Sequence, residues 1–361
     1  MKLKITLENV MFSFILYFQM IFMLSSVILP DMTNRIVLLF LFVLYFYFNK
    51  YVAVKSLSLF FISNFVLIFY TFYNIYNYHL AAVLHSDFYS FVLLMLVLLT
   101  YSNKDVVDRF TDFFYQHKKH FLYSVLIFFL LLLYSVLFQN GLHTGFGSRI
   151  PVLYGPYAVP HILAYGLLAL YCASAILYGK YQDKIFLFLK VICVCCIIWT
   201  AARSAVLAIA ILILGDFLSI QKISRKVIVA SVVILGLLYI VFFTDLLINN
   251  PLIQKTLSAL EQGSITNGRN RFAEIVLNYY NDSTSVWEKV FGTGMSSLRN
   301  ILQANASVGV GIHAHNDYIN SLCGYGLVGL VVFVICQLKP IKLYKKLIYI
   351  FLLEAFLFIL S

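Results

Sequence analysis

The sequence predicts an all-α polytopic integral membrane protein, and its composition is the first reason. Of the 361 residues, 62% are hydrophobic and only 11% are charged, whereas a soluble domain is about 45–50% apolar and about 25% charged. A soluble core could not bury so much apolar surface, so lipid must surround most of the chain. The net charge of +11 fits cytoplasmic loops rich in Lys and Arg better than nucleic-acid binding.

Long apolar runs are the second reason. A spanning helix needs about 20 mainly apolar residues, and we predict about eleven such helices. They lie near residues 9–30, 33–48, 56–77, 81–101, 121–138, 158–178, 185–200, 203–218, 227–245, 318–338 and 347–360. The apolar run 185–217 is too long for one crossing, so we divide it at Thr200–Ser204 (TAARS). The first helix lacks a clear cleavage site, so we expect it to be retained.

The distribution of cations predicts the orientation. With the N-terminus inside, the inner segments hold seventeen of the 26 Lys and Arg residues and the outer segments hold eight, as the positive-inside rule requires. The chain then forms a single membrane domain over 1–361. Its large outer loop covers about 246–317, and a smaller outer loop covers about 139–157. The inner segment 102–120 has apolar residues at helical spacing, so we expect an interfacial amphipathic helix there.

The type of cation also differs between the two sides. Fifteen of the seventeen inner cations are Lys, but six of the eight outer cations are Arg. The rigid guanidinium fork binds phosphate and carboxylate through two parallel hydrogen bonds, whereas an ammonium acts as a point charge. The outer face is therefore expected to handle an anionic ligand.

Three arginines are the main candidates for that anion site. Arg203 interrupts an apolar run, where an arginine needs a partner or a water-filled cavity. Arg269 and Arg271 lie at the predicted start of a helix whose apolar positions follow one face: Phe272, Ile275, Val276, Tyr279 and Tyr280. The N-terminus of a helix itself favours anions.

The stretch HAHND, residues 313–317, ends where an apolar run begins. Imidazole titrates near neutral pH and can take a proton from a hydroxyl, so His315 is a candidate general base. HAHND lacks the spacing of a metal-binding motif, and the six cysteines lie inside apolar runs. We therefore predict neither a metal nor a cofactor.

Four stretches together resemble the bacterial O-antigen ligase and polymerase superfamily. They are LYGPYAVPHILAYGLLA (153–169), WTAARSAVLAIAILIL (199–214), NGRNRFAEIVLNYY with the later VFGTGMSSL, and HNDYINSLCGYGLVGL (315–330). The resemblance covers about 153–330. It implies a membrane glycosyltransferase with a GT-C-like architecture in the bacterial inner membrane, with its active site facing the periplasm and a role in lipopolysaccharide biosynthesis.

The resemblance implies an undecaprenyl-diphosphate-linked oligosaccharide as the donor, alongside membrane lipid, and a chain-length regulator as a further partner. We assign diphosphate binding to Arg203 with Arg269 or Arg271, and Arg149 is a further candidate. His315 is assigned as the catalytic base, and Asn316 as a supporting residue that orients it.

Three functions agree with these features to different degrees. An O-antigen polymerase transfers the growing glycan onto a new lipid-linked repeat unit, and the short chain rich in Phe, Tyr and Ile favours it. An O-antigen ligase transfers the glycan to lipid A-core by the same donor chemistry. A lipid-linked oligosaccharide flippase should show internal repeats and charges at mid-membrane, and neither is apparent in the sequence.

Overall fold

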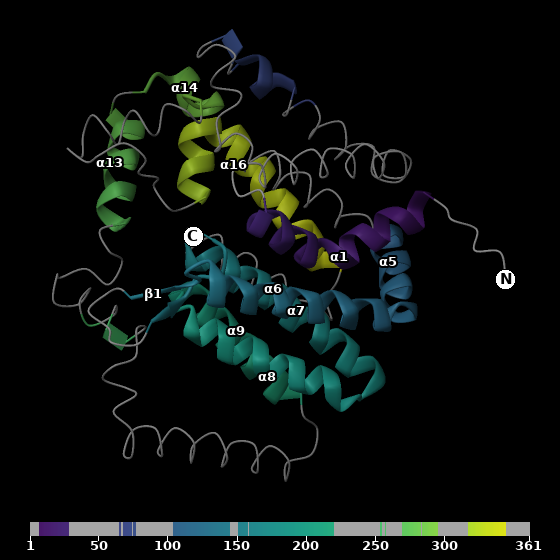
Figure 1. Ribbon diagram of the computed structural model, residues 1–361. Helices are drawn as coiled ribbons and strands as arrows, with labels where there is room; N and C mark the ends of the chain where they lie inside the picture. The colour runs from purple at the N-terminus through teal and green to yellow at the C-terminus, as the bar shows by residue number, and fades with distance from the viewer. Residues whose placement is uncertain are drawn as a thin grey trace. The chain divides into compact units, whose positions relative to one another are not determined.

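The computed structural model describes residues 7–28, 65, 68–73, 75–76, 104–144, 151–157, 159–219, 253–254, 257, 269–282, 284–294 and 317–343. These residues are mostly helical (Figure 1). The chain divides into two compact units. Unit 1 comprises Met1–Thr33 with Asp112–Ile265, and unit 2 comprises Asn34–Thr111 with Thr266–Ser361.

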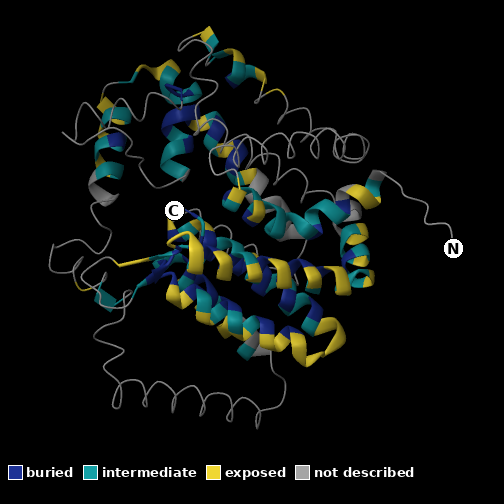
Figure 2. Ribbon diagram, viewed as in Figure 1, coloured by how far each residue is buried: buried dark blue, intermediate teal, exposed yellow. Residues whose placement is uncertain are grey.

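Unit 1 is built from apolar helices. They are α1 (Leu7–Ile28), α6 (Lys118–Phe138), α7 (Pro160–Tyr181), α8 (Lys184–Trp199) and α9 (Arg203–Ser219). α7 packs on α8 and α9, and α1 packs on α6. The core between α7 and α8 includes Leu163, Leu167, Phe186 and Cys193, all buried. Figure 2 shows exposed residues alternating with buried ones along these helices.

The outward faces of these helices are as apolar as their core. On α6 the exposed residues Leu126, Leu130, Leu133 and Leu137 recur at helical spacing and form one stripe. Water would not stabilise such a stripe, so lipid is the solvent that this surface fits. The predicted membrane class is thereby supported.

Four described helices are long and apolar enough to cross a membrane: Glu8–Ile28, Lys118–Phe138, Pro160–Tyr181 and Tyr318–Ile335. They match four of the predicted spans. The predicted division of 185–217 is also confirmed, because α8 ends at Trp199 and α9 begins at Arg203. The span predicted at 56–77 is described only in part, and those at 33–48, 81–101, 227–245 and 347–360 lie outside the described residues.

Two other features of the fold concern the segments between spans. The predicted amphipathic helix at 102–120 is observed as α5 (Lys104–Gln116). The all-α prediction missed a short antiparallel pair, β1 (Leu142–His143) with β2 (Val152–Leu153), in which Leu142 pairs with Leu153. Strands of two residues are too short to show the alternating pattern that predicts a strand.

Unit 2 contains α13 (Arg269–Asp282), α14 (Val286–Phe291) and α16 (Asp317–Leu343). Both α13 and α14 pack on α16. α14 begins with a capping box, in which the Ser285 hydroxyl accepts from the Glu288 N–H and the Glu288 carboxylate accepts from the Ser285 N–H. This reciprocal pair satisfies two backbone donors and fixes where α14 starts.

α16 is interrupted at Gly326, and hydrogen bonds formed at this interruption join α16 to the turn that follows α14. Gly326 has φ 67° and ψ −169°, a backbone region that essentially only glycine adopts. The interrupted helix presents its preceding carbonyls to other donors. The Cys323 carbonyl accepts from the Thr293 N–H at 2.9 Å and from the Thr293 hydroxyl at 3.0 Å, and the Gly324 carbonyl accepts from the Gly294 N–H at 2.9 Å.

The turn that supplies these donors needs glycine too. Gly292 has φ 86° and ψ 167°, and a Cβ there would overlap the Gly324 carbonyl oxygen. A Cβ at Gly326 would overlap the Val290 carbonyl oxygen. We call this contact between residues 290–294 and 323–326 the glycine contact. It brings two backbones together more closely than side chains would permit.

Replacing Gly326 with Ala is expected to destabilise the protein strongly. The backbone conformation alone costs an alanine about 1–3 kcal/mol, and the overlap with Val290 adds to that. Gly179→Ala in α7 is the matched control, because nothing lies within 4 Å of the added Cβ. Thermal unfolding in detergent measures the effect. Equal midpoints for the two variants would contradict this account of the break.

Candidate functional site

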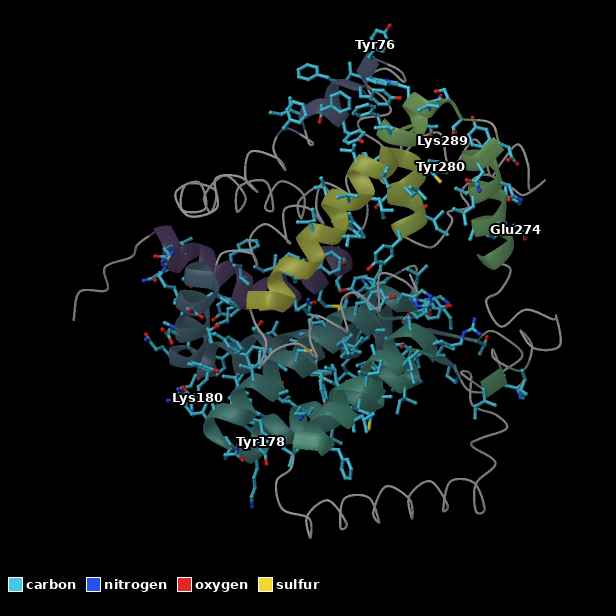
Figure 3. All side chains as sticks on the ribbon, turned by 180° about the vertical axis from the view of Figure 1, so that it is seen from behind. Tyr76, Tyr178, Lys180, Glu274, Tyr280 and Lys289 are labelled. Atoms are coloured by element: carbon cyan, nitrogen blue, oxygen red, sulfur yellow. The ribbon has the colours of Figure 1, made fainter. Side chains whose placement is uncertain are left out.

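The two ends of unit 1 differ in their cations. At one end Lys118 lies 4.0 Å from the centre of the Tyr181 ring, and Lys180 lies 4.9 Å from that of Tyr115. The Tyr181 hydroxyl donates to the Tyr115 carbonyl at 2.7 Å. Figure 3 shows Lys180 and Tyr178 at this end of α7. Arg203 lies at the other end, where α7 begins and α8 ends.

The strand pair β1–β2 lies next to the arginine end of unit 1. The N–H groups of Tyr154 and Gly155 donate to the Gly141 carbonyl at 2.9 and 3.0 Å. Trp199, the last residue of α8, donates its indole N–H to the Pro151 carbonyl at 2.8 Å. Val152 and Leu153 are buried. The smaller predicted outer loop is therefore attached to the end of α8 by the hydrogen bond from the Trp199 indole.

Arg203 is the first residue of α9 and is half-buried. The junction before it is fixed by Thr200, whose hydroxyl donates to the Ile197 carbonyl at 2.6 Å and accepts from the Ala202 N–H at 3.3 Å. Ala201 has φ 50°, which turns the chain between the two helices. The first N–H groups of a helix have no partner within it, so a guanidinium in that turn adds charge where an anion is already favoured.

Two hydroxyls that were not predicted as site residues meet at the start of α9. The Tyr165 and Ser204 hydroxyl oxygens are 3.1 Å apart. The ring of His161, one turn before Tyr165 on α7, is stacked 6.5 Å from the Tyr165 ring. Hydroxyls donate hydrogen bonds to phosphate and sugar oxygens alike. The i, i+4 spacing of His161 and Tyr165 was the available signal, since it places both on one helix face.

The arginines of the large loop lie at the start of α13. Arg269 begins this helix and Arg271 follows in its first turn. The predicted apolar face is confirmed, because Val276 is fully buried while Glu274 and Asn278 are exposed. The Cys323 thiol approaches the Val276 carbonyl at 4.0 Å, which joins α13 to α16.

A tyrosine ties α13 to α14. The Tyr280 hydroxyl donates to the Lys289 carbonyl at 2.7 Å, and the two residues lie together in Figure 3. Burial, and to a lesser extent the neighbouring Cys323, raise the pKa of Tyr280 above its ordinary value. The phenol therefore remains a hydrogen-bond donor, and α13 keeps its attachment, well above neutral pH.

The remaining predicted site residues, His315, Asn316 and Arg149, lie outside the described residues. α16 begins at Asp317, directly after the His-Asn pair. Arg203 belongs to unit 1, whereas Arg269 and Arg271 belong to unit 2. Within the described part of the chain, no group of three or more His, Cys, Asp or Glu residues could hold a metal ion.

One comparison with known proteins gives a match. The family model described as O-antigen ligase matches residues 188–334. This stretch runs from α8 into α16 and includes Arg203, Arg269, Arg271 and His315. The match confirms the resemblance seen in the sequence motifs. No curated protein and no solved structure matches the chain.

Proposed function

We propose that the protein is an O-antigen polymerase, because residues 188–334 match the family model described as O-antigen ligase. It transfers a growing glycan from undecaprenyl diphosphate to a hydroxyl of a new lipid-linked repeat unit. The bond between the anomeric carbon and the diphosphate oxygen breaks, and a bond from that carbon to the acceptor oxygen forms. The observation that carries the proposal is Arg203 in the first turn of α9, beside Tyr165 and Ser204.

The proposed leaving group is a lipid diphosphate, whose charge increases as the bond breaks. Preorganised cations and N–H dipoles stabilise such charge more than water does. Both α9 and α13 begin at an arginine, so guanidinium and helix N-terminus combine twice in this chain. We assign diphosphate binding to Arg203 with Arg269 or Arg271, and Arg149 is a further candidate. With arginines neutralising the diphosphate, the proposed mechanism requires no metal ion.

The acceptor hydroxyl must also lose its proton. We assign this role to His315, two residues before α16 begins at Asp317, with Asn316 orienting the imidazole. A neutral imidazole accepts the proton as the new bond forms, and the imidazolium then releases it to water.

The proposed site faces the periplasm of the bacterial inner membrane. The lysine end of unit 1 matches the expected cytoplasmic side, because positive residues collect there. The arginine end then lies on the side where a flipped lipid-linked glycan is presented. A chain-length regulator remains an expected partner.

O-antigen ligase is the second candidate function, and the name of the matched family favours it. A ligase uses the same donor and the same leaving group. It differs in the acceptor, which is a sugar of lipid A-core. The arginine site and the general base would therefore serve either enzyme.

Deleting the gene separates the two functions. Lipopolysaccharide from the deletion strain is resolved on a gel, and lipid-linked glycan is extracted in parallel. A polymerase deletion leaves a single repeat unit on the core. Bare core with accumulated lipid-linked polymer would establish the ligase instead, and a normal ladder would contradict both.

Arg203→Lys is expected to lose most activity in the complemented deletion strain. Lysine keeps the charge but cannot bind a phosphate through two parallel hydrogen bonds. The measurement is the ladder intensity at equal protein level, with Lys190→Arg as a matched control in the same unit. A near-normal ladder from Arg203→Lys would leave Arg203 only a role in membrane topology.

His315→Ala is expected to abolish polymer while the protein still inserts, whereas His313→Ala should retain activity. Losing a general base lowers the rate roughly 10²–10⁴-fold, so the contrast should be large. The same gel and an immunoblot measure it. If His313→Ala is the inactive variant, the motif is misassigned; if both are active, Asp317 becomes the nearest candidate base.

A further inference from the structure

We infer that α14 lies in the membrane interface, with Val286 and Trp287 inserted at the boundary between lipid headgroups and acyl chains. The break at Gly326 marks the level at which α16 leaves the hydrocarbon. The partner of this surface is the bilayer itself. The inference assigns a membrane-binding role to a helix inside the predicted large periplasmic loop.

The exposure of α14 is the reverse of that of a helix in water. Val286 is 79% exposed and Trp287 is 63% exposed. Its charged groups instead contact nearby chain: the Glu288 carboxylate accepts from the Ser285 N–H at 2.7 Å, and the Lys289 ammonium donates to the Asn281 carbonyl at 2.6 Å. Tryptophan is enriched where one side of a surface is apolar and the other is wet.

The exposed apolar surface of α16 begins directly after the break at Gly326. After Gly326 the exposed residues Leu327, Val331 and Ile335 recur every four positions and form one stripe. Before it, residues 321 and 323–326 are all buried. The glycine contact attaches the end of α14 to α16 directly before this stripe, because the Thr293 N–H donates to the Cys323 carbonyl.

The length of α16 agrees with a boundary at the break. At about 1.5 Å per residue, the part from Leu327 to Leu343 is about 25 Å long, close to the roughly 30 Å hydrocarbon thickness. The part before the break, about 13 Å long, then lies outside the hydrocarbon region, so the inferred span begins at Leu327 and not at residue 318 as predicted.

A second apolar segment also contacts the turn that follows α14. Within the predicted span 56–77, the described residues include an exposed stripe at helical spacing: Phe65, Ile68, Phe72 and Tyr76. On its other face the Tyr73 hydroxyl donates to the Gly292 carbonyl at 2.8 Å, and the Phe69 ring lies 5.5 Å from that of Phe291. The outer end of a span therefore contacts the turn that follows α14. Tyr76, which ends the stripe, is labelled in Figure 3.

This position would serve the proposed function, on which the following step rests. A lipid diphosphate lies at headgroup level, and an interfacial α14 fixes the height of the start of α16 relative to it. The membrane position itself can be measured without any activity.

Tryptophan fluorescence tests the inference, because the chain has only two tryptophans. The Trp199→Phe variant of the full chain, in liposomes, reports Trp287 alone. The quenchers are lipids brominated near the headgroup end of the acyl chain, lipids brominated near its terminus, and aqueous acrylamide. We expect blue-shifted emission, little acrylamide quenching, and strongest quenching by the shallow bromines, which places the indole about 5–10 Å below the headgroups.

Two results would overturn the inference. Water-like emission that acrylamide quenches and bromines do not would place α14 in the aqueous phase. Strongest quenching by the deep bromines would place it inside the hydrocarbon. If Trp199→Phe does not fold, subtracting the signal of Trp287→Phe from that of the unsubstituted protein gives the same quantity. A failed polymerisation assay with interfacial Trp287 would count against the proposed function and not against this position.

Discussion

The glycine contact is the constraint on which unit 2 depends. α16 is broken at Gly326, and the carbonyls before the break accept hydrogen bonds from Thr293 and Gly294. Tyr73 and Tyr70 add bonds from a third segment, to the carbonyls of Gly292 and Tyr325. A membrane helix tolerates such a break only where neighbouring groups satisfy the freed backbone. The break therefore specifies where the turn after α14 must lie.

Unit 1 meets a comparable demand at the α8–α9 junction. There the backbone reverses within residues 200–202, and the Thr200 hydroxyl replaces helix hydrogen bonds at both sides of the turn. The result presents the N-terminus of α9, with Arg203 in its first turn, beside Tyr165 and Ser204. In both units a short interruption of apolar helices is stabilised by hydrogen bonds that satisfy the freed backbone groups.

The sequence predicted the features that depend on composition and period. Long apolar runs gave the helices, the interior Arg203 gave the α8–α9 division, and the i, i+3, i+4 pattern around Val276 gave α13. It did not predict the break at Gly326, since φ and ψ depend on the contact with Val290 and Gly292, which are distant in the chain. β1 and β2 were missed because two-residue strands have no period. The Tyr165–Ser204 contact joins α7 to α9, and such tertiary contacts leave little trace in one sequence.

The positions of Lys and Arg predict sidedness, but they do not predict which arginines act together. That Arg203, Arg269 and Arg271 are outer cations remains a prediction, and the roles proposed for them rest on chemistry. The central claim is that the protein transfers a glycan from a lipid diphosphate to a lipid-linked repeat unit. Purified protein in liposomes, supplied with only that repeat unit, tests it directly. The account predicts a polymer ladder and one released lipid diphosphate for each bond formed. Release and transfer only after lipid A-core is added, or no release under either condition, would contradict it.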